Sequence, residues 1–136
     1  MSAPRILVVD DDRLTRWSLA TQLSRLGYEV ETVASAREAL AALQARPPAL
    51  ALVDVMLPDL DGFALLAKIL AAHKAVPVLL MSAYTLANNA VRARQAGAIG
   101  FLEKPCDPIL LHEAVKRALT RQADCGEPRS GSSTTA

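Results

Sequence analysis

The stretch ILVVDDD, residues 6–12, places four apolar residues directly before three carboxylates. The apolar part is continuous and rich in β-branched residues, which is typical of a parallel strand buried on both faces. The acidic residues follow where that strand ends. Because like charges at this spacing repel one another, their position at the edge of a core requires a compensating charge or a function.

Short apolar runs recur along the chain and alternate with longer helical patterns. The second run alternates apolar and polar residues, as an edge strand does, whereas three of the others are almost wholly apolar. The predicted strands are Arg5–Asp10, Tyr28–Val33, Ala49–Asp54, Val76–Ser82 and Gly100–Lys104.

The helical patterns have recognisable ends. Ser35 and Glu38 form a capping box, Asp107 with Pro108 forms an N-cap followed by proline, and Gly27 is a stop signal. The residues expected to face the core are Leu19, Leu23 and Leu26 in the first helix, Ala39, Leu40 and Leu43 in the second, Phe63, Leu66, Ile69 and Leu70 in a third that begins near Gly62, and Leu111, Val115, Ala118 and Leu119 in the fifth. The fourth helix is predicted over Leu86–Ala96.

This alternation predicts an α/β fold in which helices cover both faces of a parallel sheet. The 136 residues suffice for one domain, predicted over residues 1–121. From residue 122 onward the sequence QADCGEPRSGSSTTA has no apolar periodicity. Residues 122–136 are therefore predicted to be a disordered tail or the beginning of an interdomain linker.

The composition argues against several classes of function. A formal net charge of +1 provides no basic surface for direct nucleic-acid contact, and no apolar run approaches the ~20 residues of a membrane span. The opening MSAPR is too short and polar for a signal peptide, so the expected location is the cytoplasm, without membrane contact. Cys106 and Cys125 are expected to be unpaired, with Cys106 as a small buried hydrophobe.

Polar residues follow or end four of the predicted strands. In open α/β sheets, ligands bind beyond the carboxyl ends of the strands. Asp10 and Asp11 lie at such an end of the first strand, Asp54 at that of the third, Ser82 at that of the fourth and Lys104 at that of the fifth. If these strands are neighbours, all five side chains converge on one edge of the sheet.

Converging carboxylates have three common explanations. They bind a hard cation such as Mg²⁺, they share a proton, or they stabilise the N-terminus of a helix. The helix role is favoured for Asp12, which stands next to the first helix. The cation is favoured for Asp10 and Asp11 because of the positions of Asp54 and Lys104.

Four motifs in this order make residues 5–120 similar to the receiver domain of two-component response regulators. VVDD (8–11) resembles the acidic pair of that family, and LVDVMLPDLDGFALL (52–66) resembles its phosphoacceptor stretch. VLLMSA (78–83) and AGAIGFLEKP (96–105) resemble its switch strand and its aromatic–lysine strand. The resemblance implies a flavodoxin-like (βα)5 fold with a five-stranded parallel sheet of order 2-1-3-4-5.

The resemblance also implies roles for individual residues. Asp54 would accept a phosphoryl group, and Mg²⁺ would be held by Asp10, Asp11, Asp54 and the backbone carbonyl of Met56. Lys104 and Ser82 would donate hydrogen bonds to the phosphoryl oxygens, which carry the negative charge of the transition state. The bond between Lys104 and Pro105 is expected to be cis, since only bonds to proline adopt this form at low cost.

Phosphorylation would act as a switch. Ser82 would move toward the phosphate and the ring of Phe101 would follow, which would rearrange the surface of the fourth helix, fifth strand and fifth helix. Phe101 replaces the tyrosine often found there, so that residue's hydroxyl hydrogen bond is absent. Tyr84 is expected to slow dephosphorylation, and Trp17 to be partly buried in packing.

The resemblance implies partners as well. The phosphodonor would be a sensor histidine kinase or a histidine phosphotransfer protein, which would face the first helix with its Arg13, Arg16 and Arg25. The target would be an output domain, expected to be transcriptional, or a protein partner. DDDRLTRW (10–17) loosely resembles the opening of enhancer-binding regulators of the nitrogen-control kind. A homodimer on phosphorylation is an open alternative to a monomer.

Three other functions remain as alternatives. A haloacid-dehalogenase-type phosphatase would use Asp10 and Asp12, but Leu14 stands where it needs threonine or valine, and Asp54 has no role. A flavin-binding domain would need a glycine- and hydroxyl-rich phosphate loop in place of the three acids. A receiver that takes no phosphate would serve only as an interaction module. A receiver is not a turnover enzyme, since it promotes only its own phosphorylation and dephosphorylation.

Overall fold

The computed structural model describes residues 3–83 and 89–125 of the chain. The strands are β1 (Arg5–Val9), β2 (Glu29–Val33), β3 (Leu50–Asp54), β4 (Val78–Ser82) and β5 (Gly100–Glu103). The helices are α1 (Arg13–Arg25), α2 (Ala36–Ala45), α3 (Gly62–Ala72), α4 (Asn89–Gln95) and α5 (Pro108–Cys125). Each predicted strand is therefore present, with ends shifted by at most two residues.

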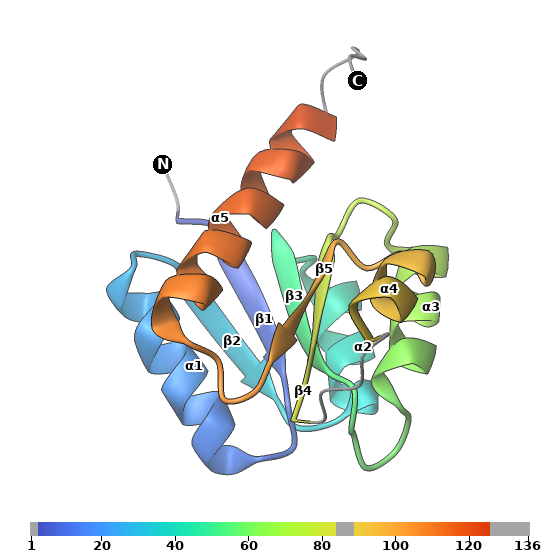
Figure 1. Cartoon of the computed structure of the whole chain (residues 1–136). Helices are drawn as coiled ribbons and strands as arrows, with labels where there is room; N and C mark the ends of the chain where they lie inside the picture. Colours follow the sequence, from blue (N-terminus) through green and yellow to red (C-terminus); the bar gives the residue numbers. More distant parts are fainter. Residues whose placement is uncertain (1–2, 84–88, 126–136) are drawn as a thin grey trace.

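The strands form one parallel sheet in the order β2-β1-β3-β4-β5, which confirms the predicted fold class (Figure 1). β1, β3 and β4 are buried along their whole length, as their apolar sequences predict. β2 lies at one edge and carries exposed glutamates, which agrees with its alternating pattern. Because all strands run in the same direction, their carboxyl ends meet at one edge of the sheet.

Helices cover both faces of the sheet (Figure 1). Alternate residues of each central strand enter opposite cores, because successive side chains of a strand point to opposite faces. Leu7 and Val9 pack in the core formed with α2, α3 and α4. Ile6 and Val8 pack in the core formed with α1 and α5. This two-sided burial fixes the register that brings the strand ends together.

The helix ends use the predicted signals. Ser35 Oγ accepts the Glu38 N–H at 3.1 Å, which is the N-cap half of the predicted capping box. The Glu38 carboxylate accepts the N–H of Ala34, the residue before the cap, at 2.8 Å. Asp12 caps α1 by accepting the Thr15 N–H at 3.0 Å, which confirms its expected helix role. After α1, Gly27 has a φ of +96°, a conformation that favours glycine.

Several predicted positions differ in the structure. Trp17 is 68% exposed, so its expected packing role is wrong; it lies two residues before buried Leu19, hence on the opposite side of α1. Leu26 lies beyond the end of α1 and is 40% exposed. Leu65, which was not among the residues expected to face the core, is fully buried in α3.

Other predictions concern the end of the domain or residues outside the described ranges. α5 continues to Cys125, past the predicted domain end at residue 121. The rest of the predicted tail, Tyr84 and the start of the predicted fourth helix lie outside the described residues. Within the described ranges, no helix is long and apolar enough to cross a membrane.

Candidate functional site

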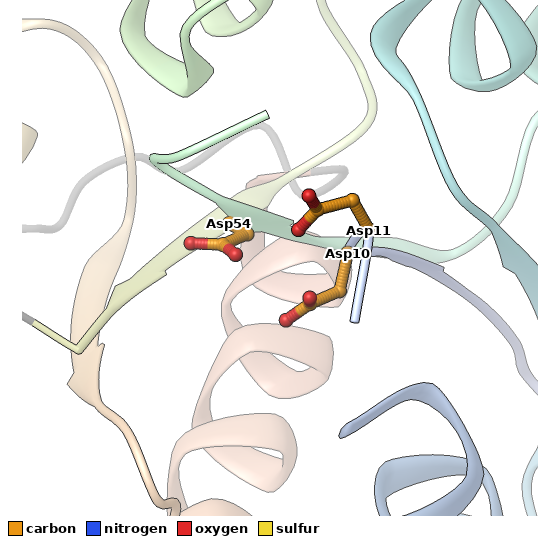
Figure 2. A group of neighbouring side chains, drawn as sticks. All are labelled: Asp10, Asp11 and Asp54. Atoms are coloured by element: carbon orange, nitrogen blue, oxygen red, sulfur yellow. The ribbon is translucent and has the colours of Figure 1, made fainter. Parts of the chain in front are cut away.

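The carboxyl edge of the sheet gathers three carboxylates, from Asp10, Asp11 and Asp54 (Figure 2). One oxygen of each lies within 4.8 Å of one oxygen of the others. Asp10 and Asp54 are buried, whereas Asp11 is exposed to solvent. The sequence therefore predicted correctly that these three side chains converge.

The register of the sheet explains this convergence. Val9 of β1 lies opposite Val53 of β3, so the next residues, Asp10 just after β1 and Asp54 at the end of β3, lie side by side. The Asp10 backbone is held from both sides, since its N–H donates to Val33 O at 3.1 Å and its carbonyl accepts from the Arg16 guanidinium at 2.8 Å. The Asp10 carboxylate also accepts the Asp12 N–H at 2.8 Å.

Lys104 provides the compensating charge that three adjacent acids require. Its ammonium lies 2.8 Å from Asp10 Oδ2 and 3.0 Å from Asp54 Oδ2. Burial alone would lower the pKa of Lys104, but the hydrogen bonds from its ammonium to both carboxylates outweigh burial and raise that pKa. Lys104 therefore remains a cation between two buried acids at neutral pH, and the Lys104–Pro105 bond is cis.

Asp54 is only 3% exposed, and its environment disfavours its charged form. Burial raises the pKa of Asp54, and the charge of Asp10 raises it further. The hydrogen bonds from the Met56 N–H, at 3.1 Å, and from Lys104 oppose this shift of the pKa without cancelling it. A buried carboxylate with a perturbed pKa and a specific charged partner is typical of a functional site.

The loop after Asp54 folds back closely onto β3. The Gly62 N–H donates to Val55 O at 2.7 Å, and a Cβ atom on Gly62 would lie 2.5 Å from the Asp54 carbonyl oxygen. Only glycine fits at this position. The sequence DG at residues 61–62 therefore closes the loop against the strand that carries Asp54.

The remaining predicted site residues lie around this cluster. Ser82 is buried at the end of β4, and its carbonyl oxygen accepts the Lys104 N–H at 2.8 Å. The Met56 side chain is 55% exposed. Phe101 is partly buried and packs against the core beneath α4, where it also lines an open depression of about 780 Å³ between β5, α4 and α5.

Cys106 lies close to this cluster in an environment that disfavours its thiolate. Its side chain packs against the core of α1 and α5. Burial raises the pKa of the Cys106 thiol to about 11, so the reactive thiolate is scarce at neutral pH.

The cluster fits a hard divalent cation. The three carboxylates have one ammonium among them, and Lys104 pairs with only two, Asp10 and Asp54, so negative charge is in excess. The exposed side chain of Asp11 leaves the cluster accessible from solvent. Oxygen ligands and room for water are what Mg²⁺ requires.

Comparison with known proteins identifies the family. The sequence model of the family described as the response regulator receiver domain matches residues 6–116. The chain belongs to this family. The crystal structure of a CheY-like receiver domain protein from Methanospirillum hungatei superposes with a TM-score of 0.86 at 37% identity, covering 92% of this chain and all of that one. This membership excludes the phosphatase and flavin-binding alternatives.

Longer relatives of this receiver domain include a protein named as a transcriptional regulator. The DNA-binding transcriptional regulator NtrC of Salmonella typhimurium is 37% identical over 125 residues, which cover 92% of this chain and 27% of that protein. NtrX of Brucella abortus superposes with a TM-score of 0.83 at 38% identity, covering 90% of this chain and 28% of that one. The chain thus spans about a quarter of the length of these relatives.

Two contacts near the receiver's acidic cluster were not expected from the sequence. Arg16 was assigned only to the surface facing a phosphodonor, but it also holds the Asp10 carbonyl. Asp59 joins the loop after Asp54 to α2, which lies 22 residues earlier in the chain. The aspartate two residues before DG is visible in the sequence, but its partner depends on how the loop lies against the helix.

Proposed function

We propose that this receiver domain accepts a phosphoryl group on Asp54 from a sensor histidine kinase or a histidine phosphotransfer protein, with Mg²⁺ as cofactor. The observation that carries the proposal is the buried Asp54 carboxylate, 3.0 Å from the Lys104 ammonium and beside two further acids. This arrangement gives a nucleophile, a cation for the phosphoryl oxygens and a set of oxygen ligands in one place.

The reaction is a transfer between two groups. An Asp54 carboxylate oxygen forms a bond to phosphorus, and the bond between phosphorus and the donor's histidine nitrogen breaks, with its electron pair leaving on that nitrogen. Lys104 follows the negative charge from the carboxylate to the phosphoryl oxygens, which it reaches from its position beside Asp54. Ser82, at the end of the neighbouring strand, donates its hydroxyl hydrogen to another of these oxygens.

Asp10, Asp11, Asp54 and the Met56 carbonyl would hold the cation. Mg²⁺ bound there would neutralise charge on the phosphoryl group and orient it for in-line transfer. Asp10 shares Lys104 with Asp54, so it also keeps the ammonium in place while Asp54 changes charge.

The output of the switch would lie on α4, β5 and α5. Movement of Ser82 toward the phosphate would free space for Phe101, whose ring lies between the core and the depression along β5. The relatives are transcriptional regulators of which this domain spans about a quarter, so we assign the output to a further transcriptional domain or a protein partner. Two phosphorylated copies could also pair through this surface.

The phosphodonor would dock on α1. Leu14 is 74% exposed and Trp17 is 68% exposed, and both lie on the helix that begins next to the acidic cluster. Arg13 and Arg25 add positive charge to the same helix. An exposed tryptophan beside an exposed leucine is typical of an interface anchor.

Intact mass measurement tests the proposal. With acetyl phosphate and Mg²⁺, the wild-type chain should gain ~80 Da, the mass of one phosphoryl group on a single side chain. Asp54→Asn should gain nothing, and chelation of the metal should prevent the gain in wild type. An unchanged wild-type mass would favour the receiver that acts only as an interaction module, and a gain that persists in Asp54→Asn would refute Asp54 as acceptor.

A further inference from the structure

The loop of residues 55–61 carries Met56 and is held at its base by backbone hydrogen bonds. The Val55 N–H donates to Met81 O at 2.9 Å, and the Gly62 N–H donates to Val55 O at 2.7 Å. These bonds fix where the loop leaves β3 and where it enters α3. They leave the outer part of the loop to be held by other contacts.

Asp59 makes that outer contact with both of its carboxylate oxygens. Oδ1 accepts the Ala36 N–H at 2.9 Å, and Oδ2 accepts the Arg37 N–H at 3.0 Å. Both donors belong to the first turn of α2. The same hydrogen bonds lower the pKa of Asp59, so the carboxylate form that makes both bonds is the one present at neutral pH.

α2 already has its own cap. Ser35 Oγ accepts the Glu38 N–H and the Glu38 carboxylate accepts the Ala34 N–H, so two residues of the helix terminus cap it without Asp59. The first N–H groups of a helix have no partner inside the helix, which makes them fixed donors for an outside carboxylate. The contact therefore serves the loop, which gains a rigid anchor, more than it serves α2.

The start of α2 also lies close in sequence to the end of β2, which contacts the loop that begins with Asp10. Val33, at the end of β2, accepts the Asp10 N–H through its carbonyl oxygen at 3.1 Å. Only two residues separate Val33 from Ala36, whose N–H binds Asp59. We define residues 33–37 as the β2–α2 junction. This junction contacts the loop that begins with Asp10 and the loop that follows Asp54.

We propose that Asp59 is a positioning residue for the cation site, because it fixes the loop carrying the Met56 carbonyl relative to Asp10 through the β2–α2 junction. The proposal rests on the function proposed above, since it concerns how the chain holds the same cation. Asp59 itself does not contact Asp10, Asp11 or Asp54 by any hydrogen bond recorded among the described residues. Its effect is to restrict the main chain three residues after Met56.

Three variants separate positioning from helix stability. Asp59→Ala removes both bonds to the junction. Asp59→Asn keeps one acceptor oxygen and loses the charge, so it should restore part of the effect. Ser35→Ala is the matched control, because it removes a cap from the same helix terminus without touching the loop.

The first measurement is the Mg²⁺ affinity by calorimetric titration. It is made at a temperature at which every variant is folded. Asp59→Ala should weaken the Mg²⁺ Kd by about tenfold, the lower end of the effect of residues that support metal ligands, and Asp59→Asn by about threefold. Ser35→Ala should change the Mg²⁺ Kd by less than about twofold, even if it lowers the Tm as much as Asp59→Ala does. In the metal-free protein, hydrogen exchange of residues 55–61 should accelerate in Asp59→Ala and not in Ser35→Ala.

The outcomes distinguish this proposal from the function on which it rests. If wild type binds no Mg²⁺, the proposed function is wrong and the positioning role falls with it. If wild type binds Mg²⁺ and Asp59→Ala matches Ser35→Ala in Kd and in loop exchange, the positioning role is overturned while the proposed function stands.

Discussion

Asp54 combines two features that raise the free energy of its charged form. Its side chain is buried, and the charge of Asp10 lies nearby. Lys104 offsets only part of this cost, because it divides its ammonium between the two acids. The residue proposed to react is therefore one whose negative charge is incompletely compensated in the unphosphorylated chain, as is common at functional sites.

We predict that Asp54→Asn stabilises the domain at pH 8. The pKa of Asp54 is raised above its usual value of 3.8, so the folded chain binds this proton more tightly than the unfolded chain does. Stability is consequently lost as the pH rises from 3.8 through the folded-state pKa, and the variant avoids that loss. A gain of ~1 kcal/mol would raise Tm by about 4 °C in a domain of this size.

Thermal unfolding at two pH values tests this prediction. The advantage of Asp54→Asn should shrink as the pH falls to about 4, where protonation removes the cost from wild type as well. Asp107→Asn provides the control, since Asp107 is an exposed cap of α5 and its amide can still accept the cap hydrogen bonds. An equal advantage at both pH values would contradict the electrostatic explanation.

Single residues also mark the limit of sequence reasoning. Asp10, Asp54 and Lys104 were predictable because each stands at the end of a strand pattern, and parallel strands bring such ends together. Asp59 was not, because its partners are backbone N–H groups, which carry no side-chain signal in the sequence. Trp17 was misassigned although its spacing from Leu19 already places it on the outer face of α1.

At the scale of elements, the sequence predicted strands better than helix faces. A continuous apolar run such as LVV in β1 is buried on both faces of the sheet. Its burial can therefore be predicted without knowing which residue faces which side. α3 is apolar around most of its circumference, and the pattern therefore gave no basis for choosing Leu65 over Phe63 as the fully buried residue. The choice depends on how closely the helix approaches β3 at Gly62.

α4 buries few of its described residues. Of Asn89–Gln95, only Asn89 and Ala93 are buried. The Arg92 guanidinium lies 4.4 Å from the centre of the Phe63 ring, which joins α4 to α3. A cation–π contact of this kind is a link that a moving α4 would have to break.

We predict that Arg92→Ala loosens α4 selectively. The substitution should cost ~0.5–1 kcal/mol, the value of an exposed cation–π pair. Hydrogen exchange in residues 89–95 should accelerate more than it does in Arg94→Ala, which removes the same charge from the same helix without a ring contact. Equal acceleration in the two variants would indicate that helix charge, and not the contact with Phe63, holds α4.

For the whole molecule, the two ends of the sheet carry different electrostatics. Toward the amino ends of the strands, Arg5 is paired with Glu31 and Arg46 with Glu29. At the carboxyl ends, three acids lie together and Lys104 pairs with two of them, Asp10 and Asp54. The molecule therefore offers a cation only one strongly attractive edge among its described residues, and a cation bound there joins β1, β3 and their loops.

Binding of a cation at this edge should stabilise the entire domain, because the unfolded chain does not hold the three acids together. At a free Mg²⁺ concentration of ten times the measured Kd, the free energy of unfolding should rise by about 1.4 kcal/mol and the Tm by about 5 °C. Asp11→Asn should abolish most of this rise without lowering the metal-free Tm, since Asp11 is exposed and its charge adds to the repulsion. Asp12→Asn is the matched control, because the neighbouring Asp12 caps α1 and asparagine is an equally good cap. It should keep the response to Mg²⁺, and an Asp11→Asn variant that responds as strongly as wild type would contradict a cation site built on the acids that end β1 and β3.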